Sequence, residues 1–343
     1  MIGPSLFPGC RLTGNGVNQG WVGPGLFFLG DIAKASGKDQ KTGHDEDYLL
    51  SFFDLTKFAM KKLLYESAPI ALKIAPKICF RGSEHENSCA WYHSIWQYLS
   101  ILGIVSSPQN QREFFVDNFR KYARTGDYKR ILISGAADYS MLALLSEAYH
   151  QEDIEPEITV IDRCETPLYL NRWYAEQKSI SLETHVINFL KYNKLETFDI
   201  ICAHSFMGCF APDTRMALFA NWQKHLRPGG KLITVNRIRP NAEGRQVFSS
   251  SQAEDFQKKV REAGDFFLKK LRIPKEELDQ WASVYTSNYG TYPVKSQDEI
   301  LALLQANGFT LDICHLEDTS RGNPSGPSVA AQALRICLVA TRS

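Results

Sequence analysis

The chain has almost no excess of charge of either sign. Its 343 residues include 39 lysines and arginines against 38 aspartates and glutamates, which gives a formal net charge of +1 at pH 7. A protein whose partner is a nucleic acid usually carries a clear basic excess. We therefore expect no nucleic-acid partner, although a local basic patch can exist within a balanced total.

Long apolar runs and closely spaced cysteines are also absent. No uninterrupted apolar run reaches the roughly 18–20 residues that a membrane span needs, and the first residues, MIGPSLFPGCRLTGNG, lack the charged start and apolar core of a secretory signal. The eight cysteines include no Cys-x-x-Cys pair, so we predict no metal. We expect a cytoplasmic protein with buried free thiols and no membrane association.

The residue pattern changes twice along the chain. Residues 1–45 are rich in glycine and proline but carry large apolar side chains, which predicts an ordered arm packed over the protein, or a lid over a site. Residues 46–127 show helical spacing without strand-like alternation, which predicts a helical lobe. Between 128 and 343, strands alternate with helices as in mainly parallel sheets. Residues 236–308 interrupt this alternation with a mostly helical cap insertion.

The most informative segment is RILISGAADY at residues 130–139. A short apolar strand ends in Gly135, Ala136 and Ala137, and an apolar helix begins near Ser140. Small residues at such a turn let backbone N–H groups and a helix N-terminus approach a ligand closely. The segment therefore predicts the first loop of a nucleotide-binding α/β sheet.

From residue 130 to the end, the order and spacing of motifs resemble those of class I S-adenosylmethionine-dependent methyltransferases. The matching segments are ILISGAADY, EITVIDR, the pair Asn188 and Phe189, FDIICAHSFMGCF, LRPGGKLITV and ANGF. The resemblance implies a Rossmann-like, seven-stranded, mainly parallel sheet with an antiparallel C-terminal hairpin. It also implies S-adenosylmethionine as the cofactor and in-line methyl transfer to O, N, S or C of a small-molecule acceptor.

The same resemblance implies which residues bind the cofactor. Asp162 ends the second strand and is expected to accept hydrogen bonds from both ribose hydroxyls, the alternative being a surface turn residue. Asn188 would bond the adenine amino group beside the ring of Phe189, while His204 and Ser205 would lie beside the methionine moiety. The predicted cofactor-binding residues are Gly135, Ala136, Ala137, Asp138, Asp162, Arg163, Asn188, Phe189, His204 and Ser205.

Three positions depart from the family pattern. The first strand has Ile133 in place of an acid, and the turn has Ala137 and Tyr139 in place of the second and third glycines. Asp138 could replace the missing acid by pairing with the amino group of the cofactor, or it could only cap the helix that begins at Ser140. The sequence leaves both roles open, and with them a degenerate, non-catalytic cofactor-binding protein.

Candidate catalytic and acceptor residues lie outside the glycine turn. Methyl transfer needs a base only where the nucleophile must lose a proton, and His204 is the first candidate and His93 the second. For both, a hydrogen-bonded core histidine is the alternative. The segment SVYTSNYGTYP reads as a loop, so we predict an acceptor pocket lined by Tyr285, Tyr289 and Tyr292 together with Tyr92 of the helical lobe.

Other functions agree less well with these motifs. A nicotinamide dehydrogenase would need Gly-x-Gly-x-x-Gly, and GAADYS keeps only the first glycine. A nucleic-acid methyltransferase would carry Asn/Asp-Pro-Pro-Tyr/Phe or a Pro-Cys nucleophile after the fourth strand, and neither is present. A protein methyltransferase and a homodimeric assembly both stay open.

Overall fold

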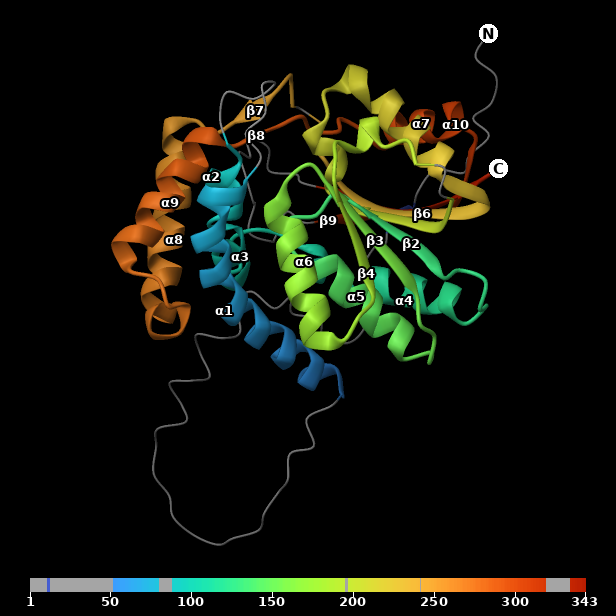
Figure 1. Cartoon of the computed structure of the whole chain (residues 1–343). Helices are drawn as coiled ribbons and strands as arrows, with labels where there is room; N and C mark the ends of the chain where they lie inside the picture. Colours follow the sequence, from blue (N-terminus) through green and yellow to red (C-terminus); the bar gives the residue numbers. More distant parts are fainter. Residues whose placement is uncertain (1–10, 13–51, 80–87, 195–196, 241, 319–333) are drawn as a thin grey trace, which may run out of the picture.

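One mixed sheet organises the molecule (Figure 1). The computed structural model describes residues 11–12, 52–79, 88–194, 197–240, 242–318 and 334–343, so the predicted arm at 1–45 lies outside the described residues apart from Arg11 and Leu12. The strand order is β1-β9-β10-β6-β5-β2-β3-β4. The strands are β1 (Arg11–Leu12), β2 (Arg130–Ser134), β3 (Glu157–Asp162), β4 (Leu182–Val186), β5 (Phe198–His204), β6 (Leu226–Ile238), β9 (Phe309–Asp318) and β10 (Leu334–Arg342).

The expected seven-stranded Rossmann-like sheet is confirmed, with β1 as an additional edge strand. Strands β4, β3, β2, β5 and β6 run parallel to one another. Strand β10 is antiparallel to both β6 and β9, which forms the expected C-terminal hairpin. Strand β1 pairs in parallel with β9 at residues His315 and Leu316.

Helices cover both faces of this sheet. Helices α4 (Arg112–Ala123), α5 (Ser140–His150) and α6 (Glu165–Lys178) lie on one face, and α7 (Arg215–His225) and α10 (Gln297–Ala306) lie on the other (Figure 1). Strand β2 shows why the sequence requires two covered faces. Ile131 and Ile133 belong to the core under α5, whereas Leu132 belongs to the core under α7. Since successive strand side chains point to opposite faces, an uninterrupted apolar run marks an interior parallel strand.

The remaining helices stand beside the sheet. Helix α1 (Phe52–Ile78) packs on α6 and on α3 (Trp96–Ile101), while α2 (Ala90–His93) packs on α9 (Lys275–Asn288). Helix α9 also pairs with α8 (Ser250–Leu271) (Figure 1). The helical lobe and the cap insertion therefore meet through α2 and α9. None of these helices, nor any other in the described part of the chain, is long and apolar enough to cross a membrane.

Two expectations from the sequence were wrong in part. The segment SVYTSNYGTYP was expected as a loop, but α9 continues to Asn288, because Tyr285 faces the core and no glycine occurs before Gly290. Gly290 and Thr291 then form β8, which pairs with β7 (Gln246–Val247). The cysteines were expected to be buried and free, but Cys209 is exposed and Cys314 is disulfide-bonded. Spacing along the chain cannot show either property, since both depend on tertiary neighbours.

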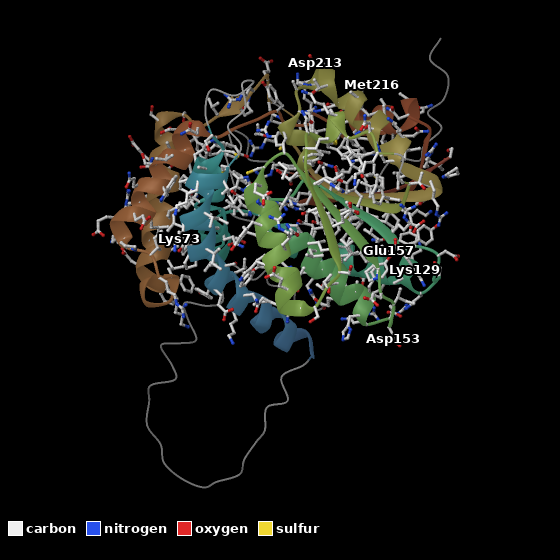
Figure 2. The ribbon with its side chains drawn as sticks, viewed as in Figure 1. Lys73, Lys129, Asp153, Glu157, Asp213 and Met216 are labelled. Atoms are coloured by element: carbon white, nitrogen blue, oxygen red, sulfur yellow. The ribbon has the colours of Figure 1, made fainter. Side chains whose placement is uncertain are left out.

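Residues labelled in Figure 2 mark the two ends of the parallel strands. Lys129 and Glu157 lie where β2 and β3 begin, and Asp213 and Met216 lie beyond the carboxyl end of β5. Ligands of open α/β sheets bind outside the carboxyl ends of the strands. A ligand site is therefore expected at the carboxyl ends of the parallel strands.

Candidate functional site

The carboxyl ends of β2, β3, β4, β5 and β6 border one cavity of about 1020 Å³. The lobe helix α2, the end of α9 and the segment after β8 form the opposite wall. Every residue predicted from the sequence as catalytic, cofactor-binding or acceptor-binding lines this cavity: Tyr92, His93, Gly135, Ala136, Ala137, Asp138, Asp162, Arg163, Asn188, Phe189, His204, Ser205, Tyr285, Tyr289 and Tyr292.

The turn after β2 depends on one glycine. Gly135 has φ +77°, a conformation that L side chains rarely adopt, and its N–H donates to the carbonyl of Ile161 over 2.9 Å. A Cβ placed on Gly135 would fall 2.3 Å from the ring of Phe206. The ring of Phe206 can approach the turn this closely only because residue 135 has no side chain.

Tyr139, which stands at the third glycine position of the family pattern, points away from the cavity. Its side chain is completely buried, stacks on Tyr174 of α6 at 4.7 Å, and hydrogen-bonds Ser67 of α1 over 3.0 Å. The departure from the glycine pattern therefore leaves the cavity open. It also joins the turn to α1.

Asp162 links the turns after β2 and β3. Its Oδ2 accepts the N–H of Ala136 over 3.0 Å, and its Oδ1 accepts the N–H of Cys164 over 2.7 Å. Burial raises the pKa of this carboxyl to about 6, although these bonds favour the ionised form. A carboxylate oxygen can accept more than one hydrogen bond, so each oxygen keeps capacity for a hydroxyl group in the cavity.

Asp138 has the capping contact that was one of its two expected roles. It is buried, and its Oδ1 accepts the N–H of Ser140 over 2.8 Å at the start of α5. Its Oδ2, near the Gln97 amide, has no hydrogen-bond partner of ordinary geometry among the described residues. Burial raises the pKa of this carboxyl. Capping through one oxygen leaves the other for a ligand cation, so the two roles are compatible.

Asn188 and Phe189 form the wall beyond β4. The Oδ1 of Asn188 accepts the N–H of Leu190 over 3.0 Å and caps the short helix Phe189–Lys191. The side chain of Phe189 is buried next to Tyr192, 6.5 Å away between ring centroids. An oriented amide beside a fixed aromatic ring suits a flat heterocyclic base.

His204 lies at the end of β5 in an environment that keeps it neutral. Its Nε2 lies 3.1 Å from Oε1 of Gln111, and the same oxygen accepts a hydrogen bond from Arg335 over 2.8 Å. Burial, together with the smaller effect of the charges of Arg335 and Arg237, lowers the pKa of His204 to about 3. A general base works best with a pKa near the working pH. These surroundings therefore favour a hydrogen-bonding role for His204 over proton abstraction.

Ser205 and His93 occupy different parts of the cavity wall. Ser205 follows β5 with φ 54°, and its N–H donates to the carbonyl of Val235 over 2.7 Å. His93 is buried at the end of α2, 5.1 Å from the ring of Tyr92, and its Nδ1 has no hydrogen-bond partner among the described residues. His93 therefore belongs to the lobe side of the cavity.

Three of the four predicted acceptor tyrosines, Tyr92, Tyr285 and Tyr289, form a continuous aromatic wall. Tyr285 stacks near Tyr92 at 6.1 Å and contacts Tyr289 at 5.3 Å, and burial raises the pKa of all three phenols. Tyr292 is fixed by its backbone, because its carbonyl accepts from Arg215 over 2.6 Å and its N–H donates to Gly208 over 2.9 Å. The wall is rigid because these residues are packed or hydrogen-bonded.

Arginines that the sequence analysis missed also line the cavity. They are Arg237, Arg239, Arg245 and Arg335, which join the predicted Arg163; two aspartates lie on the same wall. The alternation of Arg237 and Arg239 near the end of β6 is visible in the segment NRIRP and could have indicated a shared face. Arg335 could not have been placed, because its position depends on the pairing of β10.

Arg335 stands between two charged neighbours in the sheet. It lies opposite Arg237 of β6 and opposite Glu317 of β9. Like charges directly opposite each other in a sheet are destabilising. Burial, followed by the charge of Arg237, lowers the pKa of Arg335 to about 10, and its Nε has no hydrogen-bond partner among the described residues. Arg335 and Arg237 therefore bring two guanidinium groups to the same part of the cavity.

Known proteins that resemble this chain were found by structure and not by sequence. No family model matches the chain, and neither does any of the curated proteins. Similar solved structures include magnesium protoporphyrin IX methyltransferase (ChlM) from Synechocystis PCC 6803 with bound SAH, with 10% identity, a TM-score of 0.41 and coverage of 84% of this chain and 100% of that chain. N-methyltransferase NodS from Bradyrhizobium japonicum WM9 in complex with S-adenosyl-l-homocysteine has 13% identity and a TM-score of 0.41, over 82% of this chain and 99% of that chain. The S-adenosylmethionine-dependent methyltransferase SibL in its apo form has 12% identity and a TM-score of 0.41, over 81% and 69%. The assignment of the fold depends on the sheet of this chain, which is Rossmann-like with an antiparallel C-terminal hairpin.

Proposed function

We propose that the chain is an S-adenosylmethionine-dependent methyltransferase whose acceptor is a small molecule that carries a negative charge. The observation that carries the proposal is the position of Asp162. Its carboxylate stands at the carboxyl end of β3, oriented by two backbone N–H groups, on the wall of a cavity of about 1020 Å³.

The residues around the cavity fit the adenosyl cofactor. Both oxygens of Asp162 can receive the ribose diol, and Asn188 with Phe189 offers an amide and a ring to the base. The buried Oδ2 of Asp138 can receive the ammonium group of the methionine part. When bound, this cofactor supplies a methyl group on a sulfonium, which is the reactive part of the chemistry.

The volume of the cavity supports a second ligand. Pockets for one small ligand usually measure about 300–1,000 Å³. At about 1020 Å³, the cavity is at the upper end of this range and can contain a cofactor and a small acceptor together. Walls from the sheet, the lobe and the cap would hold the two reactants in line and exclude water.

The charge on the wall supports an anionic acceptor. Arg237 and Arg335 stand opposite each other on the β6 side of the cavity, and Arg335 also lies opposite Glu317 of β9. Arg239 is also buried and lines the same cavity. A carboxylate or phosphate group of the acceptor would relieve the repulsion between the arginines through charge-assisted hydrogen bonds. His204, bonded to Gln111 beside Arg335, would then orient the acceptor.

Calorimetry with purified protein tests the cofactor part of this proposal. We expect S-adenosylmethionine and S-adenosylhomocysteine to bind, and NAD to bind at least tenfold more weakly. Transfer of a labelled methyl group to small molecules from a cell extract, separated by anion exchange, tests the acceptor part. Label that appears only in neutral or cationic products would contradict the proposal of an anionic acceptor. Absence of cofactor binding would contradict the proposal that the chain is a methyltransferase.

A further inference from the structure

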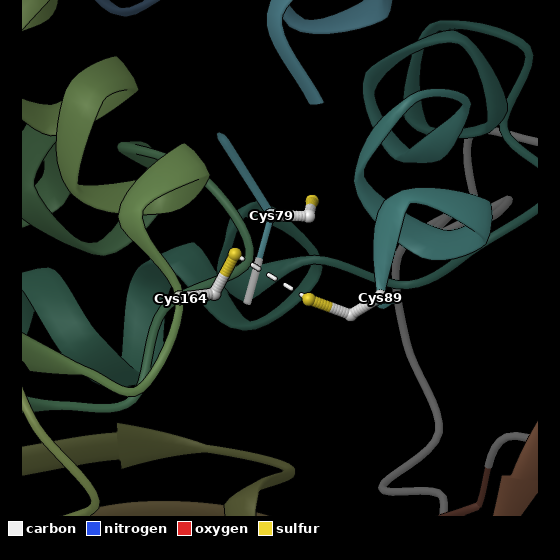
Figure 3. Close-up of side chains that lie close together, drawn as sticks. All are labelled: Cys79, Cys89 and Cys164. Atoms are coloured by element: carbon white, nitrogen blue, oxygen red, sulfur yellow. Dashed lines mark hydrogen bonds between the residues drawn. The ribbon is translucent and has the colours of Figure 1, made fainter. Parts of the chain in front are cut away.

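Three cysteine thiols that are far apart in the sequence lie together beside the cavity (Figure 3). Cys79 follows the end of α1, Cys89 precedes α2, and Cys164 lies in the turn between β3 and α6. Their sulfur atoms all lie within 4.8 Å of one another. The Sγ of Cys89 is 3.4 Å from the Sγ of Cys164, and the Sγ of Cys79 is 3.2 Å from the hydroxyl of Thr166.

An imidazole accompanies these thiols. His93 follows Cys89 by four residues, so one turn of α2 places it over the same region. The backbone N–H of His93 donates to the carbonyl of Cys89 over 3.3 Å, and His93 lines the same cavity as Cys89 and Cys164. The side chain is 7% exposed, and its Nδ1 has no hydrogen-bond partner among the described residues. A buried nitrogen without a partner is costly, which indicates that something else completes its surroundings.

We propose that Cys79, Cys89, Cys164 and His93 bind one zinc ion in a closed, structural site. Three thiolates and one imidazole form one of the common ligand sets of structural zinc. With Zn–S bonds of about 2.3 Å, sulfur atoms at tetrahedral corners lie about 3.8 Å apart. The observed separations of the three sulfur atoms allow the thiolate part of this arrangement with only small movements of the cysteine side chains.

Zinc explains the cluster better than a disulfide does. A disulfide requires two sulfur atoms about 2.05 Å apart, and it would leave the third thiol and the imidazole without a role. Soft thiolate ligands in a tetrahedral set favour zinc over the oxygen-seeking magnesium and calcium ions. Since all four positions are occupied by protein ligands, the ion would stabilise the structure without taking part in a reaction.

The site would fasten the helical lobe to the sheet. Two of its ligands come from the segments that flank residues 80–87, and a third comes from the turn that follows Asp162. The N–H of Cys164 donates to Oδ1 of Asp162 over 2.7 Å. Binding of the ion would therefore also hold the carboxylate that faces the cavity.

Metal analysis of the full chain tests this proposal without any cofactor. Protein purified under reducing conditions and equilibrated with zinc is expected to retain about one zinc per chain after gel filtration. Cys89→Ser and Cys164→Ser are expected to lose it, and His93→Gln to bind at least tenfold more weakly. The matched control is Cys202→Ala, which removes a buried thiol of β5 outside the cluster and should retain the ion.

A spectroscopic measurement keeps the test decisive if a serine variant fails to fold. Cobalt added to metal-free wild-type protein should give thiolate-to-metal charge-transfer bands and tetrahedral d–d bands, and zinc should abolish them. A wild-type protein that retains less than about 0.2 zinc per chain, or that gives no thiolate bands with cobalt, would overturn the proposal. Stoichiometric iron, or a Cys89–Cys164 disulfide found by mass spectrometry, would also overturn it.

Discussion

Alanine substitutions at Gly135 and Gly126 together measure how tightly the turn after β2 is packed. Both have nearly the same φ, +77° and +76°, so a Cβ meets the same backbone penalty at each position. They differ in the space around them. At Gly126 an added Cβ has nothing within 4 Å, whereas at Gly135 it would meet the Phe206 ring at 2.3 Å.

The expected costs follow from that difference. Gly126→Ala should lower the free energy of unfolding by about 1 kcal/mol, the cost of a left-handed backbone for an L residue. Gly135→Ala carries the same cost and adds an overpacking cost of about 2 kcal/mol, which gives about 3 kcal/mol in total. The ring of Phe206 cannot move away freely, because Phe210 contacts it edge-on at 4.9 Å.

Urea unfolding of five proteins separates the two contributions: the wild type, Gly126→Ala, Gly135→Ala, Phe206→Ala and the double variant Gly135→Ala/Phe206→Ala. In a Phe206→Ala background the clash disappears, so Gly135→Ala should then cost about 1 kcal/mol, as Gly126→Ala does in the wild type. Cofactor binding measured on the same proteins should weaken with Gly135→Ala and stay unchanged with Gly126→Ala. Equal losses of stability at the two glycines in the wild type would refute the packing of Phe206 on the turn.

Three further predictions concern charged and polar groups of the cavity. Asp162→Ala should weaken S-adenosylmethionine binding at least tenfold, about 1.4 kcal/mol, in calorimetry; unchanged affinity would end its assignment to the ribose. His204 has a pKa lowered from 6.5 to about 3, so the unfolded chain takes up its proton first as the pH falls, and stability is lost on acidification through 6.5. His204→Gln should therefore remove about 2 kcal/mol of the stability difference between pH 7 and pH 5, and a curve that matches the wild type would contradict the burial of His204. Arg335→Gln should raise the KM for an anionic acceptor at least tenfold and leave cofactor affinity unchanged, with Arg130→Gln at the far end of β2 as the control; an unaltered KM would speak against the arginine cluster as the acceptor site.

The parallel part of the fold was predictable because its signals are local. Continuous apolar runs such as Ile131 to Ile133 require two covered faces, and the alternation of strands and helices then fixes a crossover topology. The predicted site residues came together for the same reason. Those between Gly135 and Ser205 follow strands whose carboxyl ends share one edge of the sheet, and such residues can be identified from sequence order alone. Tyr92, His93, Tyr285 and Tyr289 belong to helices α2 and α9, whose packing over that edge does not follow from strand order.

The rest depends on contacts between distant segments. Arg335 faces the cavity only because β10 pairs with β6 in one particular register. The three thiols of the cysteine cluster come from the end of α1, the start of α2 and the turn after β3, so no spacing rule can find them. The neutral state of His204 likewise arises from burial and from two arginines on other parts of the sheet.

Tyr139 has a consequence for how the cavity can open. This residue ends the turn after β2. Its ring stacks on Tyr174 of α6, and its hydroxyl hydrogen-bonds Ser67 of α1. An outward rotation of α1 relative to the sheet would break the Tyr139–Ser67 hydrogen bond. The loss of this bond alone costs about 1 kcal/mol, and other contacts would add to it. The lobe and the loop should therefore behave as one body, and exchange of ligands should proceed through motions of the cap on the α9 side.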